Sequence, residues 1–225
     1  MNWRKIFQRT VNLLIAGTFF FSPIVHAEIE TDENTERHIA IREFIKELDE
    51  LTEKKKLITE KRREAIELMK SEKYEEATNI LTEIIEIEPN VSLNYSARAS
   101  CYVTLGKYEQ ATQDYDKVIE LNPNDSETYL MRGHCYLFLE KYEQAIQNYD
   151  RVIELNPNDD RAYNYRGNAY SYLGQYKLAI ADYNKSIMLN TNHDYVYYNR
   201  GISYSCLGEK EKADEDFAKL KELGW

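Results

Sequence analysis

The same residues return every 34 positions through residues 58–225, and this period constrains the fold more than any other feature of the sequence. It is marked most clearly by alanine at Ala111, Ala145, Ala179 and Ala213, by glycine at Gly133, Gly167 and Gly201, and by proline at Pro89, Pro123 and Pro157. A period of this length indicates a stack of small units, each of which buries its apolar side against its neighbours. The period defines five units, which begin at Ile58, Ser92, Ser126, Asp160 and Asp194.

Each unit contains two runs of apolar residues at helical spacing, separated by a short polar segment. In the third unit the first run includes Tyr129 and Tyr136, and the second run includes Ala145. The sequence Asn-Pro-Asn at 122–124 and 156–158 follows the second run. Because proline cannot continue a helix and asparagine is common in turns, the second helix is expected to end there. Each unit is therefore predicted to be a helical hairpin.

Small residues at fixed places predict how the two helices of a hairpin meet. The glycine of each unit, such as Gly133, and the later alanine, such as Ala145, are expected to let the two helices approach closely. Tyrosines are expected to fill the space around them, since 18 of the 19 tyrosines lie from Tyr95 onward, mostly at repeated places. This enrichment in tyrosine is therefore interpreted as primarily structural.

The repeated pattern resembles that of the tetratricopeptide repeat (TPR) family. The family pattern is an aromatic residue, a small residue, Tyr, Ala, an aromatic residue and Pro, and the third unit matches it at Tyr129, Gly133, Tyr136, Ala145, Tyr149 and Pro157. The fourth unit matches except that Thr191 replaces Pro. The first unit is degenerate, because Lys61 and Leu68 replace aromatic residues.

This resemblance covers residues 58–225 and has consequences for fold and function. It implies an all-α fold: a right-handed superhelical solenoid of about five helix-turn-helix hairpins, preceded by an N-terminal helix. TPR arrays commonly act as scaffolds and adaptors. The resemblance therefore also implies a module that binds a protein partner, either a peptide or a partner's helix, on its concave face.

Residues 1–27 are predicted to be a secretory signal peptide and not part of the fold. Three Lys and Arg residues precede the mostly apolar residues 11–21, and the Val-His-Ala sequence at 25–27 matches a small-x-small cleavage site. The apolar run is shorter than the ~20 residues that span a bilayer. We therefore expect cleavage after Ala27 and no stable membrane span in the mature chain, with a retained anchor as the alternative. Export would place the protein in a bacterial periplasm or, as the second possibility, among secreted proteins.

Residues 28–57 are predicted to be an acidic lead-in followed by a helix from about Glu36. Apolar residues then appear at helical spacing, at Ile41, Phe44, Ile45, Leu48 and Leu51, and no Gly or Pro interrupts the chain before Pro89. The helix is therefore expected to continue into the first hairpin. Two interpretations stay open: it caps the end of the array, or it forms a short coiled coil that makes the protein a homo-oligomer through residues 36–57.

Charge and motif content exclude several classes of function. Without residues 1–27 the chain carries 26 Lys and Arg against 39 Asp and Glu, a formal net charge of −13. Such a surface repels a polyanion, so nucleic acid is not an expected partner. The histidines lack the spacing of a metal site, and neither a nucleophile elbow nor a glycine-rich phosphate loop is present. We therefore expect no metal, no cofactor and no enzymatic activity.

Four arginines stand directly before the small residue of successive units, and an acidic or amide residue recurs 16 positions later. The pairs are Arg98 with Asp114, Arg132 with Asn148, Arg166 with Asp182 and Arg200 with Asp216. In an antiparallel hairpin these places lie opposite each other, so we predict a hydrogen bond or ion pair in each hairpin, because a partly buried guanidinium requires a partner. A ladder of arginines that binds anionic ligands is the alternative.

The partner-binding surface is predicted on the first helices, at residues that point away from the packing positions. They are Leu130, Met131, His134, Leu137 and Phe138 in the third unit, Asn164, Tyr165, Asn168 and Tyr172 in the fourth, and Tyr195, Tyr198, Asn199 and Ile202 in the fifth. An acidic protein that places such apolar and aromatic residues on a solvent-reachable face is expected to bind a partner there.

Overall fold

The structure is a computed structural model that describes residues 36–190 and 194–224. Every regular element within these residues is an α-helix, which confirms the predicted all-α fold. The predicted signal peptide at 1–27 lies outside them. Among the described helices, none combines the length and the apolar character needed to cross a membrane.

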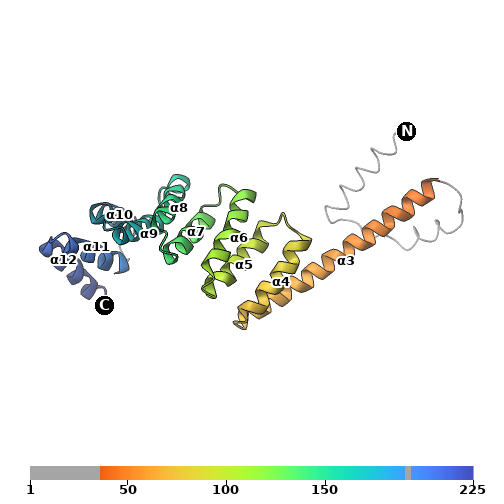
Figure 1. Cartoon of the computed structure of the whole chain (residues 1–225), viewed down its shortest axis with the longest axis horizontal. Helices are drawn as coiled ribbons and strands as arrows, with labels where there is room; N and C mark the ends of the chain where they lie inside the picture. Colours follow the sequence, from red (N-terminus) through yellow and green to blue (C-terminus); the bar gives the residue numbers. More distant parts are fainter. Residues whose placement is uncertain (1–35, 191–193, 225) are drawn as a thin grey trace. The chain divides into compact units, whose positions relative to one another are not determined.

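The described residues form ten helices that follow one another as consecutive hairpins (Figure 1). They are α3 (Glu36–Lys70), α4 (Tyr74–Ile87), α5 (Ser92–Thr104), α6 (Tyr108–Leu121), α7 (Ser126–Phe138), α8 (Tyr142–Leu155), α9 (Asp160–Tyr172), α10 (Tyr176–Leu189), α11 (Asp194–Cys206) and α12 (Lys210–Glu222). The first helices α5, α7, α9 and α11 begin at the residues where the 34-residue period places the start of a unit. The predicted solenoid of hairpins is therefore confirmed.

The chain divides into two compact units, Met1–Lys56 and Leu57–Trp225, and α3 contributes residues to both. In the second unit, Ile58 and Ala65 of α3 are buried in one cluster with Ala77 and Ile84 of α4. This part of α3 is thus the first helix of the first hairpin. In the first unit α3 carries the predicted apolar stripe, in which Leu51 is 38% exposed.

Close contact between the two helices of a hairpin depends on the small residue of each unit. A Cβ atom placed on Gly133 would lie 2.6 Å from the ring of Tyr149, which is fully buried. Gly167 faces Tyr183 in the same way. A larger side chain would require the buried ring to move, because protein interiors are close-packed. The predicted close approach of the helices is therefore confirmed.

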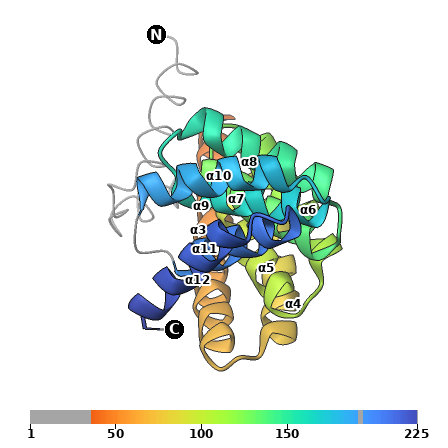
Figure 2. The ribbon, with the colours of Figure 1, turned by 90° about the vertical axis from the view of Figure 1, so that its left-hand side faces the viewer.

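Successive first helices lie on the inner side of the stack of hairpins. The first helix α9 contacts both α7 and α11, in addition to the second helices beside it. In Figure 2, which turns the view by 90°, α7 and α9 lie near the centre of the picture, below α8 and above α11. Elements on the inner side of a curved stack approach one another more closely than those outside. The first helices therefore line the surface on which the candidate residues were predicted.

Candidate functional site

The four arginines on first helices pair with the second helix of their own hairpin. The observed pairs are Arg98 with Asp114, Arg132 with Asn148, Arg166 with Asp182 and Arg200 with Asp216. In the third of these, Nε and Nη2 of the guanidinium donate to the two carboxylate oxygens at 2.7 Å each. The pairing predicted from the 16-residue spacing is confirmed.

Each of these arginines also reaches the second helix of the preceding hairpin, a contact that was not predicted. Arg166 donates from Nη1 to Oδ1 of Asp150 on α8 at 2.5 Å. The corresponding partners are Thr82 for Arg98, Asp116 for Arg132 and Asn184 for Arg200. These partners stand 16 residues before the arginine and themselves repeat every 34 residues, so the signal was present in the sequence. We call the four arginines, with their partners on both sides, the arginine seam.

The arginine seam is enclosed by protein groups. Side chains of Arg166 and Asp182 are 20% and 9% exposed. Burial raises the pKa of Asp182, and the adjacent guanidinium opposes the rise. The Cζ atom of Arg166 lies 5.7 Å and 5.9 Å from the ring centroids of Tyr163 and Tyr170. Because each guanidinium nitrogen donates to a carboxylate and tyrosines lie against its faces, this arginine serves packing and not ligand capture.

Three of the predicted partner-binding residues pack into the core between hairpins. Leu130 is only 3% exposed and belongs to a cluster that includes Ala162 and Ala169 of α9. Leu137 packs against the same cluster, and Met131 packs against the neighbouring one. The expectation that Leu130 is reachable from solvent is wrong, because the short side chains of α9 leave room for it in the core.

His134 and Tyr165 form one aromatic contact between α7 and α9. Their ring centroids are 4.1 Å apart, with an angle of 61° between the ring planes. Burial lowers the pKa of His134, and the positive charge of Arg161 lowers it further, against the opposing charge of Glu127. His134 therefore contributes a neutral ring to the inner face at neutral pH.

The predicted amides form a polar patch between α9 and α11. Oδ1 of Asn168 accepts hydrogen bonds from the hydroxyl of Tyr183 at 2.8 Å and from Nδ2 of Asn199 at 2.9 Å. Asn164, one turn earlier on α9, has a buried Oδ1 with no hydrogen-bond partner in the described part of the chain. Buried acceptors are normally paired, so this oxygen is an exception within the amide patch.

Aromatic residues that are exposed occur only on first helices within residues 41–190 and 194–224. They are Phe138 on α7, Tyr172 on α9, and Tyr195 and Tyr198 on α11, with exposures of 60%, 66%, 60% and 45%. Ile202 on α11 is 39% exposed beside them. All five were predicted, and together with His134, Tyr165 and the amide patch they form the surface that we call the inner face.

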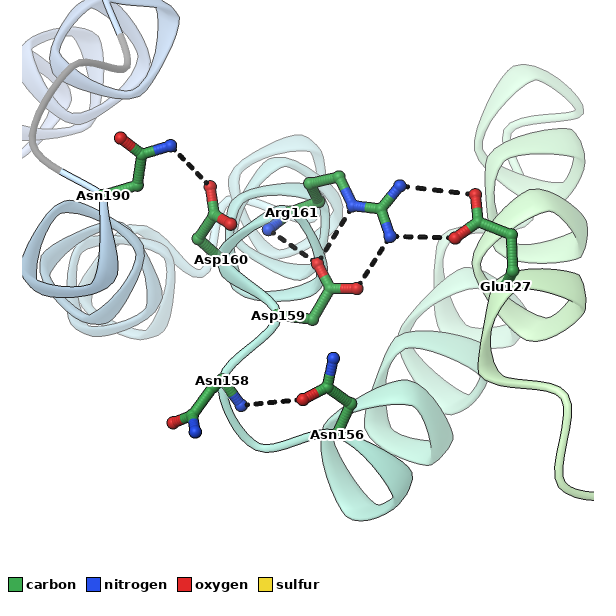
Figure 3. Close-up of polar contacts among 7 residues, drawn as sticks. All are labelled: Glu127, Asn156, Asn158, Asp159, Asp160, Arg161 and Asn190. Atoms are coloured by element: carbon green, nitrogen blue, oxygen red, sulfur yellow. Dashed lines mark hydrogen bonds and ion pairs between the residues drawn. The ribbon is translucent and has the colours of Figure 1, made fainter.

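Arg161 joins α7 to α9, as Figure 3 shows. Its Nη2 donates to Glu127 on α7 at 2.8 Å and to Asp159 at 2.9 Å. Asp159 also accepts a hydrogen bond from the backbone N–H of Arg161, at 3.1 Å, and so caps α9. Asn190, which follows α10 of the same hairpin, donates to Asp160 beside it, at 3.3 Å. This network fixes the helices that carry most of the candidate residues.

No group of three or more His, Cys, Asp or Glu side chains that could hold a metal ion occurs in the described residues. The three cysteines, two of them buried, are free thiols. The inner face therefore offers aromatic contacts and amide hydrogen bonds as its chemistry.

The three central units match the model of a known repeat family. The model of the tetratricopeptide repeat matches residues 95–125, 126–159 and 160–193, which fall in the second, third and fourth units. Residues 95–193 of the chain belong to the tetratricopeptide repeat family. The first and fifth hairpins continue the same architecture on either side of the matched TPR units. A search of curated proteins found no match to the sequence.

Solved structures of TPR proteins match the fold. MamA from Desulfovibrio magneticus RS-1 is 25% identical, with a TM-score of 0.71, over 74% of this chain and 94% of that chain. Another MamA structure is 22% identical, with a TM-score of 0.70, over 74% of this chain and 91% of that chain. YrrB, described as a TPR protein with an unusual peptide-binding site, is 22% identical with a TM-score of 0.62, over 71% and 82% of the two chains.

Proposed function

We propose that this protein is an exported, non-catalytic interaction module whose inner face binds a peptide or a helix of a protein partner. The observation that carries the proposal is the restriction of exposed aromatic side chains to first helices. Large exposed apolar residues gathered on one face of a soluble protein usually mark an interaction surface, and aromatic residues dominate the energetics of such surfaces.

The polar groups of the inner face support the same proposal. The amide of Asn199 is held by Asn168, and Asn164 has an unpaired acceptor one turn away. Fixed amides of this kind suit the backbone of an extended or helical peptide, whatever its sequence. The description of YrrB as a peptide-binding TPR protein agrees with this assignment.

Export is part of the proposal and rests on the sequence of residues 1–27. Mass spectrometry of the protein isolated from its source should show Glu28 as the first residue of the mature chain. A full-length product that fractionates with membranes would overturn the proposed location in the periplasm.

The inner face is tested with the double variant Phe138→Ala/Tyr172→Ala in the chain that begins at Glu28. We expect the variant to lose retention of proteins from an envelope extract while keeping its helical circular dichroism. Both side chains are more than half exposed, so their truncation leaves the core intact.

The matched control removes exposed apolar residues from a second helix. Leu178 and Met188 on α10 are 49% and 77% exposed. Leu178→Ala/Met188→Ala should retain the same proteins as the unchanged chain. If this control loses retention while the inner-face variant keeps it, the partner binds the outer side and our assignment of the surface is wrong.

A second candidate function is an oligomeric assembly factor of the cell envelope, which uses the N-terminal helix. The observation in its favour is the apolar stripe on α3 outside the hairpins, where Leu51 is 38% exposed. Sedimentation of chains 28–225 and 58–225 separates the candidates. A decrease from oligomer to monomer on removal of residues 28–57 would favour the assembly factor, and a monomer in both cases would exclude it.

A further inference from the structure

The turns that join first and second helices carry stacked aromatic rings from successive hairpins. Tyr142, at the start of α8, stacks on Tyr172 of the next hairpin, with ring centroids 5.2 Å apart and an angle of 17° between the planes. Tyr108 and Phe138 repeat the arrangement one unit earlier, at 4.8 Å and 5°. The second ring of each pair is at least 60% exposed, so part of each stack is open to solvent.

The turn before Tyr142 carries glutamate where three of its equivalents carry glycine. Gly106, Gly174 and Gly208 adopt φ angles of 70°, 70° and 78°, and Glu140 adopts 57° at the same place in the α7–α8 turn. The turn itself does not require a glutamate, because Glu140 donates its backbone N–H to Leu137 as Gly174 does to Ser171. Residues other than glycine are disfavoured at positive φ angles. The turn therefore places a carboxylate beside the ring stack at a conformational cost.

Charge at this turn is left uncompensated. Glu140 and Glu143 are exposed and form no ion pair in the described part of the chain, and Lys141 between them pairs with neither. Desolvation raises the pKa of Tyr142, and the negative charge of Glu140 raises it further, so the carboxylate acts on the stacked ring. At the Tyr108 stack, by contrast, glycine replaces the glutamate and Lys107 lies 3.6 Å from Glu75.

An exposed tyrosine ring with an unpaired carboxylate beside it suits a guanidinium ion. Arginine stacks on aromatic faces and is less strongly hydrated than lysine, and its attraction to a ring adds to its attraction to a carboxylate. The same chemistry already operates inside this protein, where the guanidinium carbon of Arg132 lies 5.5 Å from the ring centroid of Tyr129. The net charge of −10 for the whole chain favours the approach of a basic partner.

We propose that Tyr142, Tyr172 and Glu140 together bind an arginine side chain from a basic segment of a protein partner. This inference rests on the proposed function, because Tyr172 belongs to the inner face. It adds the chemistry of the partner: a segment that carries arginine next to the residues that contact the inner face.

The test uses two fluorescein-labelled peptides of equal length. In the first peptide arginine alternates with glycine and serine, and in the second citrulline replaces every arginine. Fluorescence anisotropy of the chain 28–225 at low ionic strength should show tighter binding of the arginine peptide. Glu140→Gln should weaken that binding about two- to fivefold, the fold-change expected for one exposed cation–π and charge contact. Tyr172→Ala should weaken it by a similar factor.

Glu72 provides the matched control. It has a φ angle of 59° in the equivalent turn of the first hairpin, but Thr104 replaces the exposed ring there. Glu72→Gln should leave peptide affinity unchanged. Glu140→Gly and Glu72→Gly should both raise the melting temperature, because glycine adopts the positive φ angle of the turn without strain. Only Glu140→Gly should lose affinity for the arginine peptide.

Equal affinity for the two peptides, no binding of either, or no effect of Glu140→Gln would each overturn the arginine site. None of these results bears on the retention experiment with Phe138→Ala/Tyr172→Ala. A protein that still retains its partners through the inner face but does not distinguish arginine from citrulline keeps the proposed function and loses only this inference.

Discussion

The arginine seam and the inner face lie on the same first helices but differ in how they use the repeat. The arginine of the seam recurs through four hairpins, and each one finds an acidic or amide partner at the same spacing on its own second helix. Positions of the inner face change in every hairpin: His134 on α7 corresponds to Asn168 on α9 and to Ile202 on α11. Contacts that build the array must recur, whereas contacts that select a partner need not.

Differences in burial follow the same division. Asp182 of the seam is 7% exposed, whereas Tyr172 of the inner face is 66% exposed. Substitutions in the seam should therefore change the free energy of unfolding, and substitutions on the inner face should change binding. Each of the following predictions sharpens this division if it holds and breaks it if it does not.

The largest effect is expected for Arg166→Ala, which should lower the free energy of unfolding by about 3 kcal/mol. Removal of one partner from an enclosed pair leaves the other charge, that of Asp182, without compensation. Urea denaturation measures the change, and Lys141→Ala, at an exposed position outside the seam, is the control and should change little. If Arg166→Ala unfolds like the unchanged chain but loses partner retention, the seam is a ligand site and the division fails.

Gly133→Ala should lower the free energy of unfolding by about 1–3 kcal/mol, the usual range for overpacking of a core. The added Cβ atom would lie 2.6 Å from a ring carbon of Tyr149, which has no space into which to move because it is fully buried. Thermal unfolding followed by circular dichroism is the measurement. A melting temperature equal to that of the unchanged chain would show that the two helices of the hairpin separate easily.

The loss of free energy of unfolding caused by Arg166→Ala should decrease as the pH falls from neutral to about 4.5. Burial already raises the pKa of Asp182, and loss of the guanidinium raises it further. A carboxyl whose pKa is higher in the folded chain than in the unfolded chain destabilises the fold while it is ionised, and protonation removes that penalty. In the double variant Arg166→Ala/Asp182→Asn, the loss of free energy of unfolding relative to the unchanged chain should not change with pH.

The smallest effect on stability is expected for Tyr198→Ala on the inner face, at about 0.5 kcal/mol or less. The side chain is 45% exposed, and its ring lies 6.4 Å from that of Phe217, centroid to centroid. The same variant should lose part of the partner retention of the unchanged chain. A loss of stability as large as that of Gly133→Ala would assign Tyr198 to the packing of α11 on α12 and remove it from the inner face.

Hairpins and their pairing arginines were predictable because both depend on local spacing that the period repeats. Gly133 and Tyr149, for example, stand on the two helices of one hairpin, so the sequence places them opposite each other. The contact from Arg166 back to Asp150 was missed because it crosses between hairpins. Its position depends on how one unit is stacked on the next, which the pattern inside a unit does not contain.

The inner face was only partly predictable for the same reason. Helical periodicity placed Leu130 and Phe138 on one side of α7, but one side chain is buried and the other is exposed. The difference arises from the neighbouring hairpin, where Ala162 and Ala169 make room for Leu130. The sequence of one hairpin does not show which of its residues the next hairpin buries.

The partners of the seam on the preceding hairpin also predict where the array comes apart first. Arg132 and Arg166 reach back to the carboxylates of Asp116 and Asp150, whereas Arg98 and Arg200 reach back to the neutral side chains of Thr82 and Asn184. A carboxylate attracts the guanidinium by its charge as well as by the hydrogen bond, whereas a neutral acceptor supplies only the hydrogen bond. The two central junctions are therefore held by ion pairs, whereas the two outer junctions are held by hydrogen bonds to neutral acceptors. Backbone amides of the outermost hairpins should therefore exchange with deuterium earlier than those of α7 and α8, as terminal units open and close while the centre stays assembled.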